Sequence, residues 1–143
     1  MKLRNKSNRW LGMVLTAFLL NSCIEIHDTF QSKKLVSSKG EKFYINTLNW
    51  GMTNDNQYSI ISKDFNRLKE RGDTIGGISG LTPFIYKFSS DTLTLVFRKG
   101  TKIKINEEFD TIELNYLSVE NSRYMELLSK AIQGEGGYHL VPE

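Results

Sequence analysis

The sequence predicts a mostly β domain with one C-terminal helix, an α+β fold. Three observations support this prediction. After residue 40, apolar and polar residues alternate along several short runs, as they do in strands that bury one face. Polar turn motifs separate these runs. Near the C-terminus the apolar spacing becomes that of a helix. We therefore expect a single β-rich domain at residues 41–143, in which the helix packs on an antiparallel β-meander or a small β-sandwich.

The predicted strands follow the alternating runs. They lie at residues 43–47, 58–61, 84–88, 93–97, 103–105 and 112–116. The polar triplet at residues 89–91 suits a tight connection, so residues 83–98 are predicted to form a hairpin. Lys99 and Gly100 make a second turn. Residues 83–118 are therefore predicted to form a β-meander of about four strands.

The helix is predicted at about residues 121–133. Its apolar residues recur at i, i+3, i+4, i+7 and i+8, which places them on one face: Tyr124, Leu127, Leu128, Ala131 and Ile132. Glu126 and Lys130 form a favourable i, i+4 pair, and Gly134 can end the helix in a left-handed conformation. Residues 138–141 are expected to add an edge strand before Pro142.

The first 22 residues have the composition of a signal peptide. Four basic residues precede an apolar stretch at residues 10–20: Lys2, Arg4, Lys6 and Arg9. A basic start, an apolar run of about 7–15 residues and a small residue before the cleavage point are the parts of a secretory signal. The stretch is shorter than the roughly 20 residues that span a bilayer. Residues 1–22 are therefore predicted to be removed from the mature protein.

Cys23 is the single cysteine of the chain, and it directly follows this segment. The sequence Leu20-Asn21-Ser22-Cys23 resembles the lipobox of bacterial lipoproteins. The resemblance implies that a diacylglycerol is attached to the Cys23 thiol and that cleavage leaves Cys23 as the first residue. An ordinary cleaved signal and an uncleaved anchor are the alternatives. Residues 23–40 are then a lipidated cysteine and a polar tether.

The resemblance implies that the protein is located in the envelope of a Gram-negative bacterium, and the outer membrane is the expected location. Whether the protein lies on its periplasmic or its surface face stays open. The whole chain has 19 Lys+Arg and 16 Asp+Glu. Residues 1–22 contain four basic residues and no acidic one, so 15 basic and 16 acidic residues remain, a net charge of −1. This balance gives no electrostatic case for nucleic-acid binding.

The sequence contains no recognisable catalytic signature. His27 and His139 lack partners at metal-ligand spacing, and lipidation of Cys23 would leave no thiol nucleophile. Ser79 is not in a Gly-x-Ser-x-Gly elbow. We therefore predict no catalytic residue, no metal site and no cofactor, and we expect a protein that is not an enzyme.

Two loop regions are candidate binding sites. Trp50 stands beside a glycine between two predicted strands, where it would either stack on a sugar or anchor an interface, or fill the core. Asn54 and Asp55 follow as turn residues. Gly76 and Gly77 belong to a glycine-rich stretch that lacks the Gly-Lys-Ser/Thr of a phosphate loop. This stretch is either a flexible connection or a binding loop.

The pattern Asp-Thr-aliphatic occurs three times, with its threonines at Thr74, Thr92 and Thr111. Aspartate favours turns and threonine favours strands, so a β-meander would repeat this pattern between its strands. The triplet also resembles the acceptor motif of a bacterial general O-glycosylation system that acts on exported proteins. That resemblance makes the three threonines candidate glycosylation sites.

Three functional hypotheses follow. The first is a lipid-anchored binding or accessory module whose partner is an envelope protein or a glycan. The second is a small periplasmic inhibitor or immunity lipoprotein. The third, and least favoured, is a small hydrolase. A binding module predicts an exposed aromatic patch or a concave pocket, an inhibitor predicts a protruding rigid loop, and an enzyme predicts clustered carboxylates or a histidine with a perturbed pKa.

Overall fold

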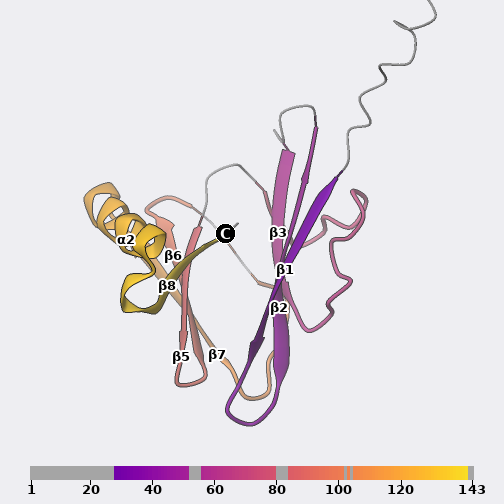
Figure 1. Cartoon of the computed structure of the whole chain (residues 1–143), viewed down its shortest axis with the longest axis horizontal. Helices are drawn as coiled ribbons and strands as arrows, with labels where there is room; N and C mark the ends of the chain where they lie inside the picture. The colour runs from indigo at the N-terminus through magenta and orange to yellow at the C-terminus, as the bar shows by residue number, and fades with distance from the viewer. Residues whose placement is uncertain (1–27, 52–55, 80–83, 102, 104, 142–143) are drawn as a thin grey trace, which may run out of the picture.

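A computed structural model describes residues 28–51, 56–79, 84–101, 103 and 105–141 (Figure 1). These residues form eight strands, the helix α2 (Asn121–Gln133) and the short 3-10 helix η1 (Glu135–Gly137). The predicted class, mostly β with one C-terminal helix, is confirmed. Cys23, His27 and the predicted signal peptide lie outside the described residues.

The strands form two four-stranded sheets. Sheet A has the order β1-β2-β3-β4 and is antiparallel throughout. Its strands are β1 (Thr29–Val36), β2 (Lys42–Trp50), β3 (Asn56–Ser62) and β4 (Ile78–Ser79). Sheet B has the order β7-β6-β5-β8. Its strands are β5 (Phe84–Ser89), β6 (Thr92–Arg98), β7 (Glu113–Val119) and β8 (Tyr138–Val141).

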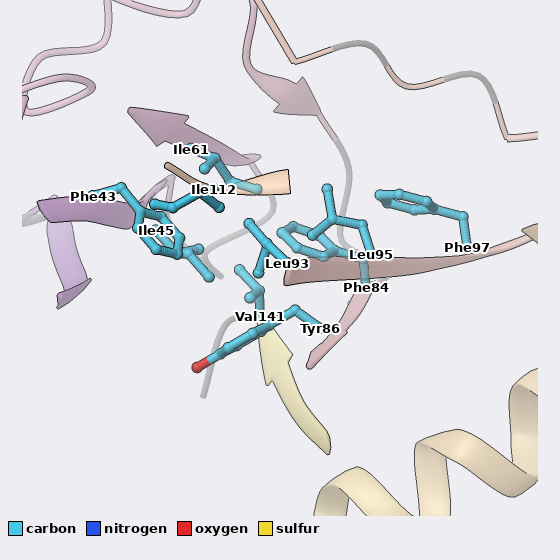
Figure 2. Close-up of a cluster of buried hydrophobic side chains, with 10 residues drawn as sticks. All are labelled: Phe43, Ile45, Ile61, Phe84, Tyr86, Leu93, Leu95, Phe97, Ile112 and Val141. Carbon is cyan, nitrogen blue, oxygen red and sulfur yellow. The ribbon is translucent and has the colours of Figure 1, made fainter. Parts of the chain in front are cut away.

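The two sheets face each other and enclose the main apolar core (Figures 1 and 2). The core residues come from both inner faces and from the segment before β7: Phe43, Ile45, Ile61, Phe84, Tyr86, Leu93, Leu95, Phe97, Ile112 and Val141. The period-two alternation supplies these side chains, because every second residue of a strand points to the same face. Of the two predicted architectures, the structure is therefore the small β-sandwich.

The helix α2 covers the outer face of sheet B, on the side away from sheet A (Figure 1). Tyr124, Leu127 and Ala131 of the predicted stripe are buried there against Ile85 and Val96. Gly134 ends the helix with a φ of 69°, the left-handed conformation that was expected. The edge strand predicted at residues 138–141 is β8, which pairs with β5.

The hairpin predicted at residues 83–98 is confirmed, since β5 and β6 pair across a two-residue turn in which Ser90 and Asp91 have positive φ. The meander predicted to continue to residue 118 is wrong. β7 pairs with β6 in parallel, which requires a long crossover instead of a second hairpin. Ile103 and Ile105 lie in that crossover and pack on the core without strand pairing.

Part of the segment predicted to be a tether is a strand. Residues 29–36 form β1 and pair along their whole length with β2, so the folded domain begins before the predicted boundary at residue 41. The alternation of this strand is interrupted by Lys33 and Lys34. Charged residues are a common feature of strands at the edge of a sheet, and β1 is the outer strand of sheet A.

Candidate functional site

A cavity of about 260 Å³ opens between the two sheets at the side where β1 and β8 lie. We name it the β1–β8 cleft. Residues from four strands line it: Gln31, Ser32, Lys33, Ile45, Thr47, Tyr86, Leu140 and Val141. β1 is the outer strand of sheet A and β8 is the outer strand of sheet B. The cleft is therefore the open edge of the sandwich.

The register of the strands gives the cleft its polar character. Lys33 pairs with Ile45, and Gln31 pairs with Thr47. Paired residues point to the same face of a sheet, so Lys33 and Gln31 share the inner face with the core residue Ile45. Both residues are exposed on the outer strand of sheet A, so they bring polar groups to the mouth of the cleft.

Tyr86 lines the cleft from sheet B, and His139 lies beside it. They are paired across β5 and β8, and their rings stack with centroids 5.1 Å apart. The Tyr86 side chain is 1% exposed. Figure 2 shows its hydroxyl group pointing away from the other core side chains, past Val141. The stacked pair thus holds a phenol group at the boundary between the apolar core and the cleft.

The opposite wall contributes further hydroxyl groups. The Oγ1 atom of Thr47 lies 3.0 Å from the Oγ atom of Ser59, and both residues are buried. Ile45, Leu140 and Val141 supply apolar surface beside these groups. Small-molecule sites commonly combine apolar walls with a few fixed polar groups that orient the ligand. The β1–β8 cleft has this composition.

A second hollow of about 530 Å³ continues from the cleft along β8. It shares Lys33 and Leu140 with the cleft and reaches the C-terminal end of α2 at residues 131–134. His139 also lines it. Lys33 lines both hollows and His139 lines the second one, and none of the described lining residues carries a carboxylate.

The described part of the chain contains no group of three or more His, Cys, Asp or Glu residues that could hold a metal ion. The same residues include no helix that is long and apolar enough to cross a bilayer. The cationic and neutral groups of the cleft can bind and orient a ligand through charge and hydrogen bonds.

Trp50 does not lie in the cleft. It is the last residue of β2 and stacks on Tyr58 with ring centroids 5.4 Å apart. Both rings pack on a small cluster of Leu48, Ile60 and Leu68 on the outer face of sheet A. Trp50 is half-buried where it packs on this cluster, and its role in binding stays a prediction. Asn54 and Asp55 lie outside the described residues.

Gly76 and Gly77 lie in the connection between β3 and β4, also away from the cleft. Gly76 has a φ of 77°, which glycine adopts without the steric penalty that other residues have. Its substitution would also press a Cβ atom against Asn106, 3.0 Å away. Gly76 lines a separate hollow of about 260 Å³ together with Arg67 and Glu107. Trp50, Gly76 and Gly77 are therefore not among the residues that line the cleft.

The three candidate threonines are half-buried. Thr92 is the first residue of β6, and the backbone oxygen of Thr74 accepts a hydrogen bond from Gly77. The Thr111 hydroxyl group donates a hydrogen bond to Glu41 at 2.6 Å and lies 2.8 Å from the Ser37 hydroxyl group. The Thr111 hydroxyl group makes contacts within the fold, so a sugar attached to it would break its hydrogen bond to Glu41.

Glu41 joins the two sheets at the end of the sandwich where the β1–β2 turn meets the crossover. Its carboxylate accepts hydrogen bonds from the Thr111 hydroxyl group and from the backbone N–H groups of Asp110 and Thr111, and it pairs with Lys63 at 3.0 Å. These donors, with the Thr111 hydroxyl group first, lower the pKa of Glu41 to about 2. The side chain of Glu41 is thus a structural contact between distant segments.

Asn46 is a structural residue that sequence reasoning missed. It is fully buried, and its amide nitrogen donates to the backbone oxygens of Asp64, Phe65 and Arg67 at 2.8–3.2 Å. Its amide oxygen accepts from Ser32 at 2.6 Å. Asn46 occupies an ordinary alternating position of a strand, so only its contacts with the connection after β3 reveal its role.

The chain matches no protein-family model, and comparisons with curated proteins and with solved structures found no significant similarity. The functional proposal therefore rests on the cleft and on the N-terminal sequence.

Proposed function

We propose that the protein is a binding module that a lipid on Cys23 holds at a bacterial cell envelope, and that its ligand occupies the β1–β8 cleft. The observation that carries the binding role is the cleft itself, a cavity of about 260 Å³ whose inner-face positions on β1 are Gln31 and Lys33. The positions face the apolar core and are nevertheless polar. Both residues are also exposed, so a ligand in the cleft can contact them.

The lining defines the class of ligand. Lys33 offers a positive charge, Thr47 and Tyr86 offer hydroxyl groups, and none of the described lining residues carries a carboxylate. Leu140 and Val141 offer apolar contacts nearby. This combination favours a small amphipathic molecule with an anionic head and an apolar body, in which the head binds at Lys33. A glycan or protein of the envelope would bind there through a group of the same chemistry.

The N-terminal sequence supports the proposed location. The lipobox-like segment ends at Cys23 and β1 begins at Thr29. Two or three acyl chains give an anchor that is effectively permanent, since each buried methylene contributes about 0.8 kcal/mol. The anchor would concentrate the domain at the membrane surface, where envelope partners are found.

A second candidate function, an inhibitor or immunity lipoprotein, is favoured by the loop at residues 63–77. Three hydrogen bonds from Asn46 fix this loop, and it presents Phe65 and Ile75 to solvent. Inhibitors use loops of this kind, because a fixed loop loses little conformational entropy when it binds.

The cleft can be tested with a fluorescent anionic amphipathic probe, anilinonaphthalene sulfonate. Titration of the wild type is compared with Lys33→Gln and with Lys34→Gln, two adjacent lysines on opposite faces of β1. We expect Lys33→Gln to weaken binding about 5-fold, which corresponds to about 1 kcal/mol. Lys34→Gln should bind like the wild type. Equal affinities for all three proteins would contradict the proposed site.

A further inference from the structure

Three aromatic rings and a lysine form a surface cluster on the outer face of sheet A, which we name the aromatic patch: Phe30, Tyr44, Phe65 and Lys69. The Phe65 ring lies edge-on to Phe30 and Tyr44, with centroids 6.0 and 5.5 Å away. The Lys69 ammonium group lies 4.8 Å from the Phe65 centroid. Phe65 is 45% exposed. Phe30 and Tyr44 beside it are half-buried. An exposed apolar patch that polar residues surround can mark a contact surface.

The exposure of Phe65 is a fixed feature of the fold. The Asn46 amide holds the backbone oxygen of Phe65 at 3.2 Å. Further along the loop, Arg67 pairs with Asp73, which also accepts from the Leu68 backbone N–H at 2.7 Å. These contacts fix the backbone that carries Phe65, and Leu68 of the same loop packs on Leu48 and Ile60 of sheet A.

The chain enters the domain at this patch. Asp28, the first described residue, accepts a hydrogen bond from the Arg71 side chain at 2.8 Å, and Arg71 belongs to the same loop as Phe65. Phe30 follows Asp28 by two residues. Four residues lie between Asp28 and Cys23, so the Cα atom of Cys23 is at most about 18 Å from that of Asp28.

We propose that the aromatic patch lies against the surface of the bilayer that holds the lipid, an inference that rests on the proposed lipid anchor. The short connection to Cys23 limits how far this face can move from the membrane. Aromatic rings favour the zone between water and hydrocarbon. Lys69 can cover the rings with its alkyl chain and extend its charge to lipid phosphates.

The charges around the patch are compatible with an anionic lipid surface. Lys34 and Lys42 are exposed and share the outer face of sheet A with Tyr44, by their positions in the strand register. Asp64 and Glu70 are the exposed acidic residues of the loop. The helix α2 lies on the opposite side of the sandwich (Figure 1), so it would face away from the membrane.

The orientation is tested by attaching a nitrobenzoxadiazole dye to single cysteines in the full-length, acylated protein. Asn66→Cys places the dye beside Phe65, and Ser129→Cys places it on the exposed face of α2. Both proteins are reconstituted in vesicles of phosphatidylethanolamine and phosphatidylglycerol that contain a nitroxide-labelled phospholipid. Incorporation of labelled palmitate is measured on the same samples.

We expect strong quenching of the dye at position 66 and at least 3-fold weaker quenching at position 129. Adding Phe65→Ser and Lys69→Glu to the Asn66→Cys protein should reduce the quenching, while the circular dichroism spectrum shows that the fold is kept. If palmitate is incorporated but the quenching is equal at both positions, the membrane contact is overturned and the lipid anchor is not. The loop would then be available to bind a protein partner. Failure to incorporate palmitate would overturn the anchor and, with it, this inference.

Discussion

The hydroxyl group of Thr111 donates a hydrogen bond to the carboxylate of Glu41 at 2.6 Å, although 70 residues separate the two in the sequence. Glu41 belongs to the turn between the first two strands of sheet A, whereas Thr111 ends the crossover that leads to β7 of sheet B. One ionised side chain thus connects the β1–β2 turn of sheet A to the crossover that leads into sheet B.

Acid should therefore destabilise the protein through Glu41. The folded-state pKa of Glu41 is about 2, lowered from 4.5. Its stabilising effect is fully present above pH 4.5 and is lost as the pH falls from 4.5 to about 2. We expect the thermal midpoint of the wild type to fall through this window and that of Glu41→Gln to fall less. Asp91 and Glu126 also have lowered pKa values, so some acid dependence will remain.

Thermal melts followed by circular dichroism between pH 7 and pH 2 provide the measurement. Glu70→Gln is the matched control, since Glu70 is exposed on the loop after β3. A pH profile of Glu41→Gln that is superimposable on the wild type would contradict the structural role of this carboxylate.

Asn46→Ala should destabilise the protein by about 2–4 kcal/mol, because it removes the amide contacts with three backbone oxygens and with the Ser32 hydroxyl group and leaves these part-buried oxygens without a donor. Urea denaturation measures the loss. Limited proteolysis of the variant should cut within residues 63–77 first, since Asn46 holds this loop. Asn115→Ala, on an exposed position of β7, should change the free energy of unfolding by less than about 0.5 kcal/mol.

Leu127→Ala should cost about 2–4 kcal/mol of stability, because Leu127 is buried between α2 and sheet B and its truncation leaves a cavity. Leu117→Ala is the matched control: Leu117 is a leucine of β7 that is 40% exposed. Urea denaturation should separate the two variants clearly. Equal losses would show that α2 contributes little to the folded state.

Tyr86→Phe should weaken binding of the anionic probe about 3-fold, because it removes one hydroxyl group from the cleft. The ring and its stacking on His139 are kept, so far-ultraviolet circular dichroism should be unchanged. His139→Ala would instead remove the ring that supports Tyr86. A probe affinity of Tyr86→Phe equal to that of the wild type would exclude this hydroxyl group from the binding site.

The sequence predicted the features that depend on local spacing. The alternation around Phe43 and Ile45 identified a strand with one buried face, and the stripe that includes Leu127 and Ala131 identified the helix. Both patterns are periodic, so a short window of residues contains the signal.

Features that depend on distant partners were not predictable in the same way. Ile103 and Ile105 alternate as in a strand, yet they lie in a crossover, because a segment without regular pairing can also bury every second residue. β1 was missed because Lys33 and Lys34 interrupt its alternation. The β1–β8 cleft arises from two outer strands more than 100 residues apart in the sequence, and no local pattern relates them.

The order of the strands along the chain also constrains how the sandwich assembles. Sheet A uses residues between 29 and 79, and its neighbouring strands are consecutive in the chain. Sheet B contains the last strand of the described chain, because β8 follows α2 and returns to pair with β5. Contacts of such long sequence separation form slowly. A chain that is synthesised from the N-terminus can therefore complete sheet A while sheet B still lacks its final strand. A truncation that removes β8 would leave one edge of β5 unpaired.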